Sequence, residues 1–290
     1  MLRQVTLALA LALASGCGSK KQEPTSLPTP SDRQVLQAAY DKHLEETTSL
    51  LSPVAGWPTD RDCDAALWAG VARRAGVTET DMLAALQPDG RPTRRPYQDC
   101  GPVSEGLAGD SGATTSSDMV LGTVLGLHAQ GSVEGLTRLY DYGSSQTWVM
   151  GVPRELISRV VLKPTGIGML AEALKDVGGE DHPLARAIPN PPLPVEADYE
   201  EHLQALSVLL QRDMGRDPGQ PTTCASRLED GLIQAVCLDL DRATQLLKDP
   251  AKYKAPSYVR AGVDHPESQA ILERVHWLLA AKLVLEASPN

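Results

Sequence analysis

The segment that decides the fold reads Tyr40-Asp41-Lys42-His43-Leu44 and is followed by the pair Leu50-Leu51. The same order returns 159 residues later as Tyr199-Glu200-Glu201-His202-Leu203, followed by Leu209-Leu210. Each segment carries apolar residues at helical spacing, so each is expected to form a helix with one apolar face. One such match between Leu-rich helices carries little weight, and the case for a repeat depends on further matches.

Three further matches occur in the same order and at nearly the same separation. They pair Cys63, Leu67 and Gly70 with Cys224, Leu228 and Gly231, Pro96 with Pro256, and the helix 119–129 with the helix 277–287. A recurrence at a constant large offset is typical of an internal duplication. The sequence therefore predicts two copies, 39–129 and 198–287, with inserted helices within 132–177.

The composition favours helices joined by Pro- and Gly-rich loops. The chain of 290 residues has no Phe, so Leu, Val and Ala must fill its core. Helix signals predict a start at Ser31, a second start at Asp60, and a capping box, Thr78-Glu79-Thr80-Asp81, for a short helix through Leu86. Further helices are expected over 117–130, 132–142, 153–162 and 165–177.

These expectations define the fold class. The sequence predicts an all-α protein, in which α-helical hairpins form an α/α solenoid or toroid-like array with an internal duplication. About 250 folded residues are enough to bury a substantial core, and we expect a single helical domain over 31–290.

The N-terminus has the pattern of an export signal. Arg3 precedes an uncharged run that ends at Ala14, and Ala14-Ser15-Gly16-Cys17 resembles a bacterial lipobox, in which the cysteine is acylated. The apolar run is too short to span a bilayer, which needs about 20 helical residues. We expect 1–16 to be a signal peptide and the lipid bilayer to be a partner through acylated Cys17. The alternative is a buried apolar N-terminal helix.

A tether is expected between the anchor and the domain. Residues 17–30 are rich in Ser, Pro, Thr and Lys, which bury little apolar surface, so this segment is predicted to be disordered. By resemblance to proteobacterial lipoproteins, Gly18 in place of an Asp favours the outer membrane of the cell envelope.

The charge balance argues against nucleic acid as a partner. The chain has 27 Lys plus Arg against 37 Asp plus Glu, a formal net charge of −10. An acidic surface repels phosphate, and the cluster Arg91, Arg94 and Arg95 is too small to reverse that field.

Four cysteines follow Cys17, and export would place them in an oxidising compartment. Cys63 and Cys100 bracket a loop-rich stretch, and we expect them to form a disulfide. The pairing of Cys224 with Cys237 stays open, because a continuous helix would hold their sulfurs about 20 Å apart unless it breaks, for example at Gly231. Zinc is the other interpretation, but no CxxC or CxH spacing occurs, so we expect no metal and no cofactor.

Acidic and aromatic residues gather around two predicted helix ends. Asp118, Asp141, Tyr142 and Trp148 form the candidate ligand cleft, although helix capping and core packing explain the same residues. His43 and His202 stand three residues after a Tyr in each copy, as an acid–base pair would, or as a repeated packing contact. No catalytic residue is assigned.

Several segments resemble a pattern in uncharacterised exported bacterial lipoproteins with an α/α-toroid-like helical fold. They are Cys63-Asp64, Cys100, 115–122, Asp141-Tyr142-Gly143 and Trp148-Val149-Met150-Gly151. The resemblance implies a fold and a compartment, not an activity. Where the pattern has an Arg before its Asp, this chain has Ser117 before Asp118, so an Arg/Asp pair there would lack one member.

The leading functional hypothesis is a membrane-anchored envelope lipoprotein whose helical domain is a non-catalytic binding or scaffold module. Its partner would be an envelope protein or a saccharide. The alternative is an α/α-type carbohydrate-active enzyme or sugar-binding protein that uses the candidate cleft.

Overall fold

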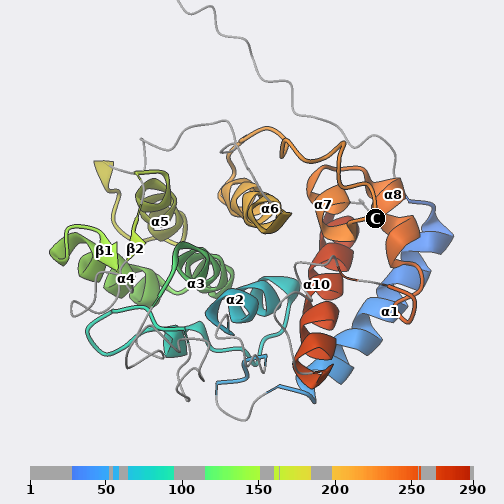
Figure 1. Ribbon diagram of the computed structural model, residues 1–290, viewed down its shortest axis with the longest axis horizontal. Helices are drawn as coiled ribbons and strands as arrows, with labels where there is room; N and C mark the ends of the chain where they lie inside the picture. The colour runs from blue at the N-terminus through green and yellow to red at the C-terminus, as the bar shows by residue number, and fades with distance from the viewer. Residues whose placement is uncertain are drawn as a thin grey trace, which may run out of the picture.

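The computed structural model describes residues 28–51, 55–58, 65–94, 115–150, 160–162, 164–183, 198–253, 255 and 266–287. Helices make up most of this part of the chain, which confirms the all-α class (Figure 1). The elements are α1 (Pro30–Thr48), α2 (Ala65–Ala75), the 3₁₀ helix η1 (Met82–Ala85), α3 (Ser117–Gln130), α4 (Val133–Ser145), β1 (Val149–Met150), β2 (Val160–Val161), α5 (Pro164–Asp176), α6 (Asp198–Asp213), α7 (Gly231–Val236), α8 (Leu240–Leu247) and α10 (Pro266–Ala287).

Two helix starts differ from the sequence prediction. The cap of α1 is Thr29, whose hydroxyl accepts the Asp32 N–H, and not Ser31. Pro30 suits the first helical position because it has no N–H to satisfy, so the helix begins earlier. The short helix η1 is capped by Asp81 rather than by Thr78, since the Asp81 carboxylate accepts the Leu83 N–H at 3.0 Å.

The centre of the molecule is the contact between α2 and α3. All of α2 is buried except Arg73 and Arg74 at its C-terminal end. A Cβ atom on Gly70 would lie 1.9 Å from the carbonyl oxygen of Gly122 on α3. The two backbones can approach this closely only because both residues lack a side chain.

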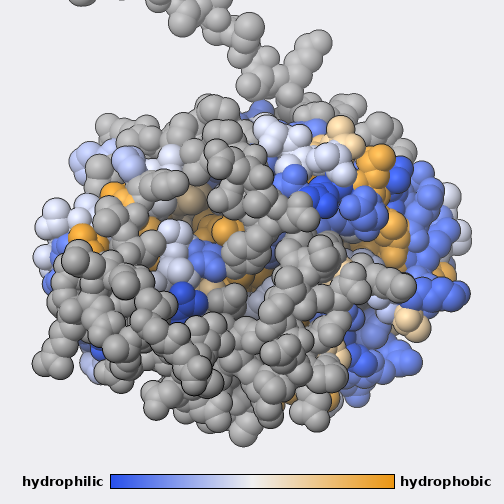
Figure 2. All heavy atoms as spheres, in the orientation of Figure 1, coloured by the Kyte–Doolittle hydropathy of each residue, from blue (hydrophilic) through white to orange (hydrophobic). Residues whose placement is uncertain are grey.

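The remaining helices extend to both sides of this contact. Figure 1 shows α4, α5 and the strand pair at one end of the molecule and α1 and α8 at the other, with α2, α3 and α6 between them. The first and last helices, α1 and α10, lie side by side. On the face shown in Figure 2 the surface over α1 and α8 is mostly hydrophilic.

The predicted helix 153–162 is wrong where the structure describes it. Val160 and Val161 form β2, which pairs antiparallel with β1, and 151–159 lie outside the described residues. Thr147 and Trp148 have positive φ angles, 55° and 63°, and end α4 in a turn. Val149, Val160 and Val161 are β-branched residues, which favour the extended conformation of a strand.

The segment before α7 explains how two cysteines meet. Residues from Cys224 to Asp230 form turns, and α7 begins only at Gly231, where Asp230 caps it. Cys224 and Cys237 therefore approach to a Cα–Cα distance of 5.7 Å and form a disulfide with an S–S length of 2.01 Å. The pairing that the sequence left open is present, because 224–230 form turns in place of a continuous helix and α7 starts only at Gly231.

Candidate functional site

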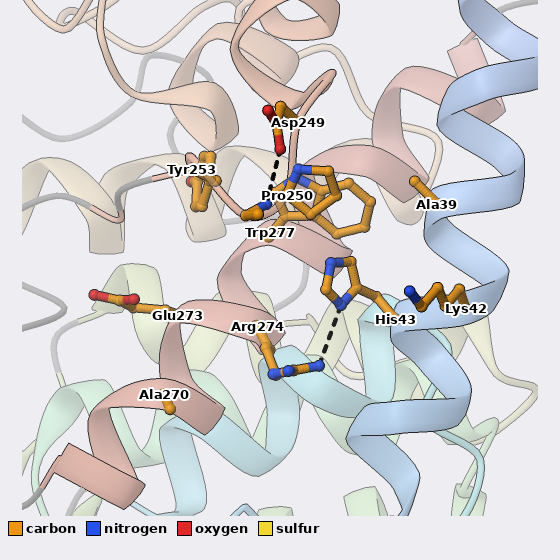
Figure 3. Close-up of a pocket in the computed structure, with 11 residues that line it drawn as sticks. Ala39, Lys42, His43, Asp249, Pro250, Tyr253, Ala270, Glu273, Arg274 and Trp277 are labelled. Atoms are coloured by element: carbon orange, nitrogen blue, oxygen red, sulfur yellow. Dashed lines mark hydrogen bonds between the residues drawn. The ribbon is translucent and has the colours of Figure 1, made fainter.

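A pocket of about 520 Å³ lies between α1, α10 and the loop that follows α8 (Figure 3). Its volume is in the range of small-molecule sites in proteins. Three elements line it: Ala39, Lys42 and His43 from α1; Asp249, Pro250, Ala251 and Tyr253 from the loop; and Ala270, Glu273, Arg274 and Trp277 from α10.

Helical spacing brings the pocket residues onto matching faces. On α10 the lining residues stand at positions i, i+3, i+4 and i+7 from Ala270, which is one face of a helix. On α1 they stand at i, i+3 and i+4 from Ala39. Each helix also contributes one small side chain to the lining, Ala39 from α1 and Ala270 from α10.

The aromatic wall of the pocket is held rigidly. Trp277 is 2% exposed, and its indole N–H donates to the Leu247 carbonyl at 3.3 Å. The imidazole of His43 lies against it, with ring centroids 4.9 Å apart and a tilt of 59°. In Figure 3 these two rings face each other across the gap between α10 and α1.

A charged network stands beside this ring pair. Arg274 Nη1 lies 2.6 Å from Glu46 Oε2 and 3.2 Å from His43 Nδ1. Because a guanidinium only donates, His43 Nδ1 must accept, which fixes the neutral tautomer with hydrogen on Nε2. Partial burial, with Arg274 as the second cause, lowers the pKa of His43. His43 is thus a neutral ring at neutral pH.

Tyr253 links the pocket to a buried polar chain. Its hydroxyl lies 2.6 Å from His276 Nδ1, and His276 Nε2 lies 3.9 Å from Asp230 Oδ1. His276 precedes Trp277 on α10. His276 is fully buried in the core, whereas Trp277 lines the pocket. Behind it, the rings of His202 and His276 are 5.7 Å apart.

Burial keeps the two histidines and the tyrosine of this chain uncharged at neutral pH. It lowers the pKa of both His276 and His202 to about 3, and it raises the pKa of the Tyr253 hydroxyl well above its ordinary value. A base with a pKa of 3 is mostly neutral at pH 7 and accepts protons poorly in a reaction. The chain is therefore suited to holding Tyr253 and its loop in place rather than to proton transfer.

The four residues of the predicted cleft do not line this pocket. Asp118 lies half-buried in the first turn of α3, and Asp141 is exposed on α4. Tyr142 is buried, and its Cβ approaches the position that a Cβ of Gly90 would occupy. Trp148 stands edge-on to the Tyr140 ring at 5.1 Å. A shared sugar cleft formed by these residues stays a prediction.

The other predicted site residues fall elsewhere. Cys17, Cys63 and Cys100 lie outside the described residues. His43 contacts Trp277 of α10, whereas His202 is fully buried and stacks on Trp68 of α2 at 5.7 Å.

Sequence reasoning missed the pocket itself. The i, i+3, i+4, i+7 face of α10 was visible in the sequence, but nothing in the sequence indicates that α1 lies opposite this face.

Within the part of the chain that the structure describes, no three His, Cys, Asp or Glu side chains converge as a metal site. No described helix combines the length and apolar character needed to cross a membrane.

Comparison with known proteins adds no relative: no family model, no curated protein and no solved structure matches the chain.

Proposed function

We propose that this chain is a lipid-anchored protein of the cell envelope. Its helical domain is a non-catalytic binding module, and the ligand site of that module is the pocket between α1 and α10. The observation that carries the proposal is the lining of that pocket. It combines an aromatic wall, Trp277 and His43, with charged groups of both signs. Such mixed lining is typical of sites that orient a small ligand.

The protonation states support binding rather than catalysis. The histidine behind Tyr253 has a pKa of about 3, and His43 accepts a hydrogen bond from Arg274. The imidazole of His276 is therefore not poised near neutral pH, where an effective general base operates. The side chains instead hold one another in fixed positions, which lowers the entropic cost of ordering a site around its ligand.

A pocket-filling pair of variants tests the site. Ala39→Phe places a ring in the pocket, whereas Val35→Phe places the same ring on α1 at a residue that is 55% exposed. Ligand-observed NMR with amino acids, short peptides, capped peptides and monosaccharides should reveal a class that binds the wild type and Val35→Phe but not Ala39→Phe. Ala270→Phe, which fills the pocket from α10, should repeat the loss, and circular dichroism checks that the variants fold. If no class binds, or if both filled variants bind it normally, the pocket is not the ligand site.

The proposed anchor is acylated Cys17, and Gly18 in place of an Asp favours the outer membrane. Acylation would attach the domain to the bilayer with about 0.8 kcal/mol for each buried methylene. Cys17→Ser should move the protein from the membrane fraction to the soluble or uncleaved fraction, with loss of the lipid mass from the N-terminal peptide. Unchanged partitioning of this variant would contradict the anchor.

We also infer that the domain arose by duplication and that its hairpins form a toroid-like array. The element order α1, α2, η1, α3 parallels α6, α7, α8, α10. Gly56 and Gly215, which stand 159 residues apart, have φ angles of 63° and 71°, and Asp81 and Asp239 cap η1 and α8. In a crystal structure, superposition of 39–129 on 198–287 should match these helices in order. Unmatched helix axes would remove the duplication.

A further inference from the structure

Two cations of the pocket share one carboxylate. Lys42 Nζ lies 3.7 Å from Glu46 Oε1, and Arg274 Nη1 lies 2.6 Å from Glu46 Oε2. His43 adds no charge, because its imidazole accepts from Arg274 as a neutral ring. In Figure 3 the Lys42 and Arg274 side chains both extend to the His43 side of the pocket. Two positive charges there stand against one negative charge, so the group formed by Lys42, His43, Glu46 and Arg274 is net positive.

The acidic residues of the lining do not cancel this charge. Among the lining residues that the structure describes, they are Asp249 and Glu273. Asp249 already pairs with Lys252, whose Nζ lies 2.7 Å from the Asp249 carboxylate. Figure 3 shows the Glu273 side chain directed away from the gap between α10 and α1. A ligand in this gap therefore meets the net positive group.

Arg274 has donors left for a bidentate contact. Its contacts with Glu46 and His43 both use Nη1, whereas Nε and Nη2 donate to no residue that the structure describes. These two nitrogens form one edge of the planar guanidinium, and this edge matches the two oxygens of a carboxylate. Arg74 makes the same contact elsewhere in the chain, where its Nε and Nη2 lie 2.6 Å and 2.8 Å from the two oxygens of Asp213. A carboxylate can therefore bind Arg274 while Glu46 and His43 keep their contacts.

Apolar surface adjoins the net positive group. Trp277 lies against the His43 ring, and the small side chains of Ala39, Pro250 and Ala251 line the same pocket. Burial of apolar ligand surface here releases water and favours binding. The volume of about 520 Å³ leaves room for a ring beside the charged group.

We propose that the ligand is a small carboxylate with an apolar body, either a free acid or the C-terminal residue of a peptide. Its carboxylate binds Arg274 and Lys42, and its apolar body lies against Trp277 and Ala39. One negative charge on the ligand matches the one excess positive charge of the group. The assignment rests on the proposed function, because it requires that the pocket binds a ligand at all.

A set of related probes tests the assignment by isothermal titration calorimetry with the detergent-solubilised full chain. Phenylacetate carries both the carboxylate and the apolar body, phenylacetamide lacks the charge, and acetate lacks the body. We expect phenylacetamide and acetate to bind at least about tenfold more weakly than phenylacetate. Phenethylamine, which reverses the charge, should bind more weakly still, and the affinity for phenylacetate should fall as salt is raised.

N-acetylphenylalanine distinguishes the two sources of the carboxylate. It presents the same ring and charge together with the amide of a peptide C-terminus. Binding at least about tenfold tighter than that of phenylacetate identifies a peptide C-terminus as the source. Equal affinity shows that a free acid is sufficient.

Charge variants locate the carboxylate. Lys42→Gln should weaken binding of phenylacetate about fivefold or more and leave the affinity for phenylacetamide unchanged. Lys175→Gln is the matched control, because Lys175 on α5 is 45% exposed, pairs with Asp181 at 3.5 Å and does not line the pocket. Its affinities should equal those of the wild type. Glu46→Gln removes the shared carboxylate and should strengthen binding of phenylacetate, a gain that misfolding cannot produce.

Three results would overturn the carboxylate assignment. They are equal affinity for phenylacetate and phenylacetamide, an equal effect of Lys42→Gln and Lys175→Gln, and no binding of phenylacetate or N-acetylphenylalanine. If phenylacetamide, phenyl phosphate or glucose then binds and Ala39→Phe abolishes that binding, the pocket is a ligand site of another class, and only the assignment fails. If no probe binds in a manner sensitive to Ala39→Phe, the proposed function fails as well.

Discussion

The hydroxyl of Tyr253 lies 2.6 Å from Nδ1 of His276, which joins a residue of the pocket wall to one that is fully buried in the core. The tautomer of the neutral imidazole decides whether Nδ1 accepts this bond from the phenol or donates it. The loop after α8 is thereby tied to α10, and the position of the pocket wall depends on the interior of the protein.

Removal of this hydroxyl should destabilise the fold. In Tyr253→Phe the buried His276 Nδ1 loses this hydrogen-bond partner, and an unsatisfied buried polar atom costs about 1–3 kcal/mol. Urea denaturation measures the change in the free energy of unfolding. Tyr140→Phe is the control, because Tyr140 contacts Trp148 and His182 through its ring, which the variant keeps. Equal losses in the two variants would contradict the special role of the Tyr253 hydroxyl.

Acid should weaken the fold in a window set by two histidines. The pKa of His202 and of His276 is about 3 in the folded chain, against 6.5 for the ordinary side chain. The unfolded chain therefore binds more protons between pH 6.5 and 3, and the free energy of unfolding falls as pH falls through that range. Each histidine contributes a slope of up to about 1.4 kcal/mol per pH unit.

Measurements between pH 7 and 5 separate this effect from the protonation of most carboxylates. His202→Phe, which keeps a ring beside Trp68, should remove about half of the slope. A free energy of unfolding that stays flat over this range in the wild type would show that the buried histidines do not control acid stability.

Loss of the Cys224–Cys237 disulfide should lower stability without changing the fold. The bond closes a short loop, and removal of such a cross-link costs about 2–4 kcal/mol because the unfolded chain gains freedom. The variant with both cysteines changed to Ala should therefore melt at a lower temperature. Non-reducing peptide mapping of the wild type should find this pair and, from the sequence prediction, Cys63 joined to Cys100. Free thiols at any of the four would contradict the corresponding pairing.

A methyl group on Gly70 should disrupt the centre of the molecule. In Gly70→Ala the new Cβ would lie 1.9 Å from the Gly122 carbonyl oxygen, so α2 and α3 must separate. Overpacking of this kind costs about 1–3 kcal/mol or more. Gly166→Ala is the matched control on α5, where the nearest atom is the end of the Leu162 side chain at 3.3 Å. It should be neutral or stabilising, since Ala favours a helix over Gly by about 1 kcal/mol.

Local patterns along the chain were enough to predict the helical class and several helix positions. The segment 117–130 forms a helix as predicted, and Gly76 follows the end of α2 in a positive-φ conformation. These features depend on residues within a few positions of one another, where apolar periodicity and glycine geometry act directly. The same local signals misplaced the cap of α1 and predicted a helix where Val160 and Val161 form a strand.

Only the tertiary structure decided the pocket. Lys42 and His43 stand near the start of the described chain, and Arg274 and Trp277 near its end, yet the packing of α1 on α10 brings them together. Helix periodicity states which residues share a face, but it does not state which face lies opposite. That choice depends on the shapes of whole helices and on contacts such as Gly70 with Gly122, and these exist only once the chain has folded.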